Sequence, residues 1–187
     1  MPERKSPLTK LPLRVPGQSL EDKIEQVAVD EYSKYITYGA GSVGIVVLIW
    51  IIWLSKTLPN PWVGTICGII GVVYSIQGIY KTNKRLRLLR LGRDGERAVA
   101  EALDSLRGKG ARVIHDIVAG KFNIDHVVLA RRGIFAIETK TYTKYSNSQI
   151  SYNGEKIFIG KWEPPKDPVH QASQNAQWLT KTLKKKD

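Results

Sequence analysis

The chain is poor in cysteine and histidine, which narrows the chemistry open to it. It has one cysteine and three histidines in 187 residues. The cysteine, Cys67, lies inside an apolar stretch, so no intrachain disulfide can form and nothing speaks against a reducing compartment. The sequence has no cysteine and histidine pattern of a zinc site, no G-x-x-x-x-G-K phosphate loop, no Ser/His/Asp arrangement and no internal repeat. The sequence therefore gives no support for the functions that these motifs carry.

Charge is missing from two stretches, residues 36–54 and 62–80. Each has about the length needed to cross a bilayer core of roughly 30 Å. Only residues 55–61 separate them, so two helices here must run antiparallel. Glycines inside both stretches would let the helix backbones approach each other closely. We therefore expect a transmembrane helical hairpin at residues 36–80; the alternative is a buried helical pair in a soluble protein.

Cations flank the two stretches unevenly. Residues 81–95 hold six Lys and Arg, residues 21–35 hold two, and the connection holds one. Because positively charged flanks stay in the cytoplasm, we expect a multi-pass protein of the cell membrane with both termini cytoplasmic. The first stretch begins too far from Met1, and lacks the cleavage pattern, to be a removable signal peptide.

The net charge of +12 is concentrated in one part of the chain. Residues 81–187 hold twenty-two Lys and Arg against eleven Asp and Glu, whereas residues 1–35 hold six of each. Such a surface attracts both nucleic acid phosphates and the anionic headgroups of a lipid bilayer. Leucines interleaved with arginines predict a basic interfacial segment at 81–91. The cations better placed to meet a phosphate backbone are Lys109, Arg112, Lys121, Arg131, Arg132, Lys144 and Lys161.

The rest of the chain divides into three predicted regions. Residues 1–18 form a disordered basic tail that contains prolines, residues 19–35 form a juxtamembrane helix capped by Ser19, and residues 92–187 form a soluble domain. The pattern in this domain predicts an α/β fold with a small core. Its predicted elements are a helix at 93–107, strands near 111–118, 123–130 and 133–140, short strands within 148–161, and a helix ending near residue 183.

The segment from 123 to 140 is the most informative part of the domain. It consists of two apolar strands with Asp125 at the start of the first and Glu138 and Lys140 at the end of the second. Alternation along a strand puts Glu138 and Lys140 on one face. Asp125 joins them if the connection has two or four residues, for instance a turn centred on Arg132 and Gly133 that places Asp125 opposite Lys140. A three-residue loop without a bulge would separate them.

These three side chains suggest a metal-dependent site. Two neighbouring carboxylates repel each other, and a hard divalent cation such as Mg²⁺ or Mn²⁺ relieves that repulsion. A lysine beside the metal can orient a water molecule or neutralise charge that develops on a phosphoryl group. The alternative is a hairpin whose charged ends are only solvated.

Four motifs in order resemble the nuclease-related domain, NERD, of the PD-(D/E)xK nuclease superfamily. They are Gly92-Arg93-Asp94-Gly95-Glu96, the strand from Asn123 to Val128, Ile137-Glu138-Thr139-Lys140, and Gln171-Ala172 before a helix. The resemblance covers roughly residues 92–183, about half the chain. It implies that Asp125 and Glu138 bind the metal, that Lys140 serves the attacking water or the transition state, that Glu96 is an accessory acid, and that Gln171 positions the lysine or the phosphate.

The resemblance also implies a fold and a function. The fold is a restriction-endonuclease-like α/β core, and the function is a membrane-anchored, metal-dependent nuclease that hydrolyses nucleic acid at the cytoplasmic face. DNA is the favoured substrate, and the choice between DNA and RNA stays open. This core usually continues with another strand, whereas the chain stops at Asp187, so that strand is dispensable or the chain is a fragment. Three alternatives stay open: a nuclease fold that has lost turnover, a non-catalytic nucleic-acid-binding module at the membrane, and a membrane scaffold that binds a protein partner. The oligomeric state is also open.

Overall fold

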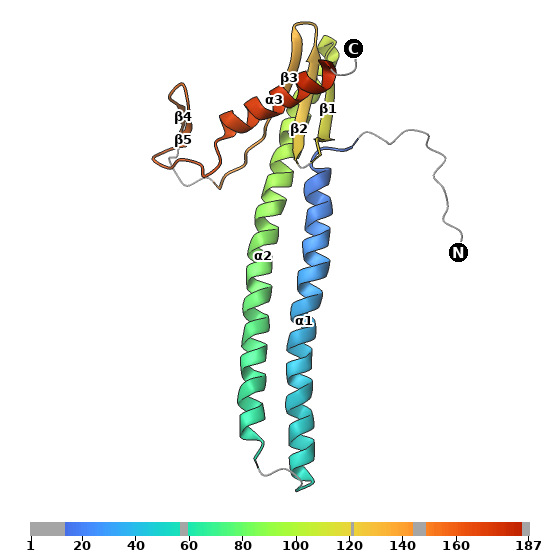
Figure 1. Ribbon diagram of the computed structural model, residues 1–187, viewed down its shortest axis with the longest axis vertical. Coiled ribbons are helices and arrows are strands. Elements are labelled where there is room, and N and C mark those ends of the chain that lie inside the picture. The colour runs from blue at the N-terminus through green and yellow to red at the C-terminus, as the bar shows by residue number, and fades with distance from the viewer. Residues whose placement is uncertain (1–13, 57–59, 121, 144–148, 185–187) are drawn as a thin grey trace, which may run out of the picture. The chain divides into compact units, whose positions relative to one another are not determined.

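The computed structural model describes residues 14–56, 60–120, 122–143 and 149–184 (Figure 1). Their contacts divide the chain into two compact units, Leu20–Arg90 and Leu91–Asp187, the second together with the segment before Leu20. The helices and strands are α1 Gln18–Leu54, α2 Trp62–Asp104, the 3₁₀ helix η1 Ser105–Lys109, β1 Arg112–Val118, β2 Asn123–Ala130, β3 Gly133–Ile137, β4 Ile150–Tyr152, β5 Ile157–Ile159 and α3 Pro168–Lys184.

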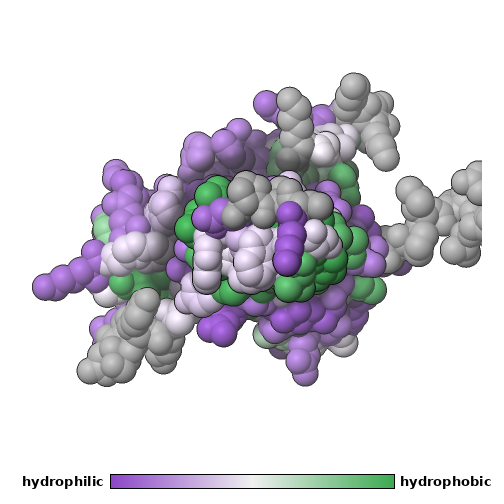
Figure 2. All heavy atoms as spheres, turned by 90° about the horizontal axis from the view of Figure 1, so that it is seen from below, coloured by the Kyte–Doolittle hydropathy of each residue, from purple (hydrophilic) through white to green (hydrophobic). Residues whose placement is uncertain are grey.

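The first unit is a helical hairpin built from parts of α1 and α2. Both helices are long and apolar enough to cross a membrane, by length and composition. Glycines of the apolar part of α2 face α1: a β-carbon added at Gly68 would lie 2.1 Å from Val46 Cγ2, and one at Gly71 would lie 2.1 Å from Ser42 Oγ. Apolar side chains surround the hairpin on its outside, as Figure 2 shows at the end near residue 60. The close packing therefore depends on glycines of the second span, as predicted. The prediction is wrong for the glycines Gly41 and Gly44 of the first span, where an added β-carbon would meet nothing within 4 Å.

The hairpin continues past the predicted membrane spans. Leu86 is 1% exposed because it packs against Ile24 and Val27 of α1. The hydroxyl of Thr82 donates to Glu31 Oε2 at 2.8 Å, and Arg85 forms an ion pair with the same carboxylate. Leu86 thus contacts the neighbouring helix, and the interfacial position of residues 81–91 stays a prediction.

The start of α1 differs from the prediction. The helix begins at Gln18, and Ser19 is not its cap; instead the Ser19 N–H and Oγ donate to the carboxylate of Asp116 at 2.8 and 2.6 Å. Arg14 Nε also donates to Asp116, at 2.7 Å. Residues 14–18 are therefore held in place, contrary to the predicted disorder. Residues 1–13 lie outside the described part of the chain.

The predicted helix at 93–107 is not a separate element. The helix α2 runs without a break to Asp104, and the 3₁₀ helix η1 follows it. Glycine inside a helix costs only about 1 kcal/mol relative to alanine, so Gly92 and Gly95 do not end it. The predicted start of a new helix near residue 93 is wrong.

The second unit contains a three-stranded antiparallel sheet in the order β1, β2, β3, and a separate hairpin of β4 and β5. Buried Val127 of β2 belongs to a core cluster with Trp178 and Leu179 of α3, so this helix packs on the sheet. Asp167 caps α3 by accepting the Val169 N–H at 2.9 Å. Two predicted elements are longer than the observed ones. The strand predicted at 133–140 ends at Ile137, and the short strands predicted within 148–161 begin at Ile150.

Candidate functional site

The register of β2 and β3 brings Asp125 and Glu138 to the same face. Ala130 pairs with Gly133 and His126 with Ile137, so the connection has two residues, Arg131 and Arg132. This is one of the two lengths that the sequence argument required, but the example turn centred on Arg132 and Gly133 is wrong. Continued by one step, the register places Asp125 opposite Glu138 and not opposite Lys140.

Asp125 is fixed by the backbone that follows β3. Strand pairing stops at Ile137, and the freed N–H of Thr139 donates to Asp125 Oδ2 at 2.7 Å. Thr139 lies between Glu138 and Lys140 in the chain. The hydrogen bond therefore holds the Asp125 carboxylate beside the segment that carries the other two predicted site residues.

Glu138 is buried and has partners for both of its oxygens. Its side chain is 4% exposed; Oε1 accepts Lys140 Nζ at 2.5 Å, and Oε2 accepts Asn175 Nδ2 at 2.9 Å. Asn175 of α3 is itself 1% exposed. An ionised carboxylate can be buried only when it is paired in this way. The structure thus assembles an acid, a lysine and a carboxamide, of which sequence reasoning missed Asn175.

Glu96 lies close enough to these acids to be affected by their charge. The pKa of Glu96 is raised to about 7, first by burial and then by the negative charges of Asp125, Asp116 and Glu138, while Lys140 opposes the rise. Burial likewise raises the pKa of Asp125 to about 6, against the hydrogen bond from Thr139. Glu96 and Asp125 therefore titrate near neutral pH, as groups that exchange protons during catalysis do.

Asp116 is a fourth acid of the cluster, and sequence reasoning did not predict it. His115 pairs with His126 and Ile117 with Ile124, so the register places Asp116 opposite Asp125. Asp116 is buried and has φ of 50°. Its carboxylate oxygens accept hydrogen bonds from Ser19 and Arg14, so Asp116 adds negative charge to the cluster although its oxygens are already hydrogen-bonded. The signal in the sequence is weak, one acid among the branched apolar residues of β1.

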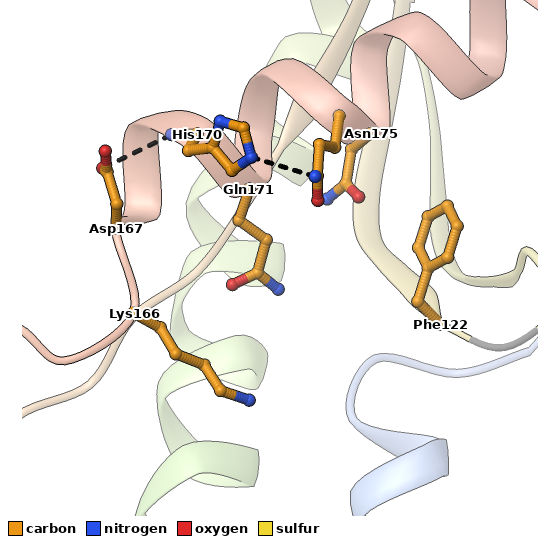
Figure 3. Close-up of a pocket in the computed structure, with 7 residues that line it drawn as sticks. Phe122, Lys166, Asp167, His170, Gln171 and Asn175 are labelled. Carbon is orange, nitrogen blue, oxygen red and sulfur yellow. Dashed lines mark hydrogen bonds between the residues drawn. The ribbon is translucent and has the colours of Figure 1, made fainter.

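Gln171 is predicted to position either the lysine or the phosphate. Among the residues that the structure describes, its side chain makes no hydrogen bond to Lys140; the carboxamide that reaches the acid and lysine pair belongs to Asn175, one helical turn later. Gln171 instead lines a pocket of about 370 Å³ (Figure 3). The other residues around this pocket are Phe122, Lys166, Asp167, His170, Gln174 and Asn175.

Comparison with known proteins identifies the domain that holds this cluster. Residues 91–187 match the family model of the nuclease-related domain, NERD. The chain belongs to the NERD family. No curated protein and no solved structure matches the chain. The NERD match therefore supports a nuclease-like fold and a role connected with nucleic acid, and the roles of single residues must be argued from their geometry.

The divalent metal that the resemblance implies stays a prediction, for which the cluster offers two carboxylates. Within residues 14–56, 60–120, 122–143 and 149–184, no three Asp, Glu, His or Cys residues are grouped so that they could hold an ion. Mg²⁺, however, is commonly bound by one or two carboxylates together with waters and substrate phosphates. Asp125 and Glu138 supply two such carboxylates, and the raised pKa of Asp125 reflects in part the negative charge of Glu138, which a cation would offset.

Proposed function

We propose that this NERD domain hydrolyses phosphodiester bonds of nucleic acid, with DNA as the first substrate to test. The observation that carries the proposal is the cluster itself. Glu138 and Lys140 are in direct contact, Asp125 is bound to the backbone between them, and the pKa of Glu96 rises to about 7 beside them. Burying charged groups costs free energy, and these groups are not needed for core packing. Their presence therefore favours a catalytic role.

Each residue has a role that follows from its surroundings. Asp125 and Glu138 would hold Mg²⁺ or Mn²⁺, which lowers the pKa of a bound water and polarises a phosphoryl oxygen. Lys140 places a positive charge beside that position, where it would stabilise charge developing on the phosphate. Glu96 can accept a proton at neutral pH because its pKa is about 7. Asn175 fixes the orientation of Glu138.

We further propose that the domain works at the cytoplasmic face of a membrane. The two apolar helices support an anchor, and the excess of cations after the second apolar stretch supports a cytoplasmic position for the domain. Exposed Arg131 and Arg132 at the β2–β3 turn would add sequence-independent affinity for phosphates. Lys121 and Lys144, which the sequence also assigned to phosphate contacts, lie outside the described residues.

The test is cleavage of matched DNA and RNA substrates by the detergent-solubilised full chain, at increasing Mg²⁺ or Mn²⁺. We expect Asp125→Asn and Glu138→Gln to abolish metal-dependent cleavage. Glu155→Gln is the control, because it removes one negative charge from an exposed position between β4 and β5 of the same domain. Equal cleavage by wild type and Glu138→Gln would reject the proposed activity and identify a contaminant.

A second candidate function has an observation of its own. Both oxygens of Glu138 already accept hydrogen bonds from protein groups, Lys140 and Asn175. A domain whose acid is neutralised in this way could bind nucleic acid without cutting it. In that case the same preparation binds DNA with a steep dependence on salt but shows no cleavage at any metal concentration.

A further inference from the structure

The pocket lined by Gln171 adjoins the acid and lysine cluster through one shared side chain, Asn175. Asn175 lines the pocket and donates to Glu138 Oε2 at 2.9 Å, so one side chain belongs to both places. A phosphate at the cluster would therefore have its attached nucleoside at or near the pocket. A volume of about 370 Å³ is at the lower end of the range for small-molecule sites, and it suits one nucleotide better than a base pair.

The pocket has the side chains that recognise a nucleobase. Phe122 is 39% exposed, and its ring is supported edge-on by Trp178, with the ring centroids 6.0 Å apart. Bases stack on exposed aromatic rings of this kind when they are unpaired. The wall also contains carboxamides, whose paired donor and acceptor match the edge of a base, and one lysine, which can meet a phosphate.

The orientation of these groups fits a single ligand. Figure 3 shows Gln171 and Lys166 extending to the same side of the N-terminal part of α3, with Phe122 on the opposite rim. Gln174 is engaged with His170, at 3.0 Å between the side-chain nitrogens. Among the described residues the side-chain amide of Gln171 has no hydrogen-bond partner, so it remains available to a ligand.

We propose that this pocket binds one unpaired nucleotide next to the phosphate held at the cluster, with its base stacked on Phe122 and its edge bound by Gln171. A base inside an intact duplex is stacked between its neighbours and cannot reach a ring on a pocket wall unless it is flipped out. The preferred substrate is then a single strand, a flap or a frayed end of DNA or RNA, and not an intact duplex. This inference rests on the proposed function, because it specifies the substrate of the same site.

The experiment measures binding in the absence of divalent metal, so that cleavage does not enter the result. The full chain in detergent is titrated with a DNA single strand carrying 2-aminopurine, the same strand in a blunt duplex, the corresponding RNA strand, and the free mononucleotide. We expect either single strand to bind more tightly than the duplex or the mononucleotide, with quenching of the 2-aminopurine fluorescence as the base stacks.

Three variants assign the effect to the pocket. Phe122→Leu keeps apolar packing against Trp178 but removes the aromatic face, and it should weaken single-strand binding by roughly 5- to 100-fold, the value expected for one stacked base. Phe122→Trp should restore binding. Phe135→Leu, at an exposed phenylalanine of β3 that does not line the pocket, should have no effect. Duplex binding should stay the same in all three.

The outcomes separate this inference from the proposed function. Equal affinity for single strand and duplex, or wild-type binding by Phe122→Leu, overturns the inference even if the protein cleaves DNA. If Phe122→Leu lowers the unfolding temperature, Gln171→Ala decides instead, because an unchanged single-strand affinity in that variant also overturns it. Preference for the single strand that depends on Phe122, in a protein that cleaves nothing, supports the pocket and rejects the nuclease.

Discussion

Thr141 lies directly against Gly95, so close that a β-carbon added to Gly95 would be 1.8 Å from Thr141 Oγ1. Gly95 precedes Glu96 on α2, and Thr141 follows Lys140 after β3. The absence of a side chain at residue 95 thus lets the segment that carries the lysine pack against the helix that carries the accessory acid. We regard this contact as the reason why Glu96 and Lys140 influence each other across 44 positions of the chain.

Gly95→Ala should disturb this contact. The added methyl group has no room, so we expect a loss of about 1–3 kcal/mol in the free energy of unfolding, the usual cost of overpacking, together with lower activity. Gly108→Ala is the matched control, since a β-carbon there meets nothing within 4 Å. Thermal unfolding of both variants measures the effect. Thr141→Ala in the Gly95→Ala background should recover part of the loss, and no recovery would show that the clash is elsewhere.

Glu96 should make the domain less stable as the pH rises. Its pKa is about 7 in the folded chain and near 4.5 in an exposed glutamate, so between these values the folded state holds a proton that the unfolded state has released. Stability from this group therefore falls from pH 4.5 to pH 7 and stays low above it. We expect Glu96→Gln to raise the unfolding temperature at pH 8 and to change it little at pH 4.5.

The control for this measurement is Glu101→Gln, at an exposed position of the same helix. Asp125 interacts with Glu96, so the difference between the two pH profiles reports Glu96 together with its coupling to Asp125. Parallel profiles for wild type and Glu96→Gln would contradict the raised pKa.

Asn175→Ala should weaken the site by removing the hydrogen bond that Asn175 donates to Glu138. It leaves Glu138 Oε2 without its donor although the Glu138 side chain is only 4% exposed, and an unsatisfied buried acceptor costs about 1–3 kcal/mol. We expect a lower unfolding temperature and reduced cleavage. Gln177→Ala, at an exposed position of α3 that does not line the pocket, is the control for the loss of a carboxamide. Full activity in Asn175→Ala would mean that Lys140 alone is sufficient to orient Glu138.

The membrane hairpin can be tested by labelling in intact cells. In a Cys67→Ala background, we expect a reagent that does not cross membranes to modify Asn60→Cys, in the connection between α1 and α2. The same reagent should modify Ser151→Cys, in β4, only after the cells are permeabilised. The result follows from the cations that flank the second span. Release of the protein by carbonate without detergent would show that the helices do not cross a bilayer.

The fold could be predicted where local pattern decides it. Two uncharged stretches gave the two long helices, and alternation in 123–130 and 133–137 gave two strands of the sheet. Alternation alone also put Asp125 and Glu138 on one face once the connection had an even number of residues. The order of four short motifs was sufficient for the NERD family, which the match to residues 91–187 confirms.

The tertiary structure decided what depends on contacts between distant parts of the chain. Asn175 reaches Glu138 only because α3 packs on the sheet, and no local pattern distinguishes it from Gln171. Asp116 became part of the site through its place opposite Asp125 and through Ser19, 97 residues away. The sequence determined which groups the chain carries and which face of a strand they share. Only packing determined which of them meet, because hydrogen bonds and charge interactions act over a few ångströms and not along the sequence.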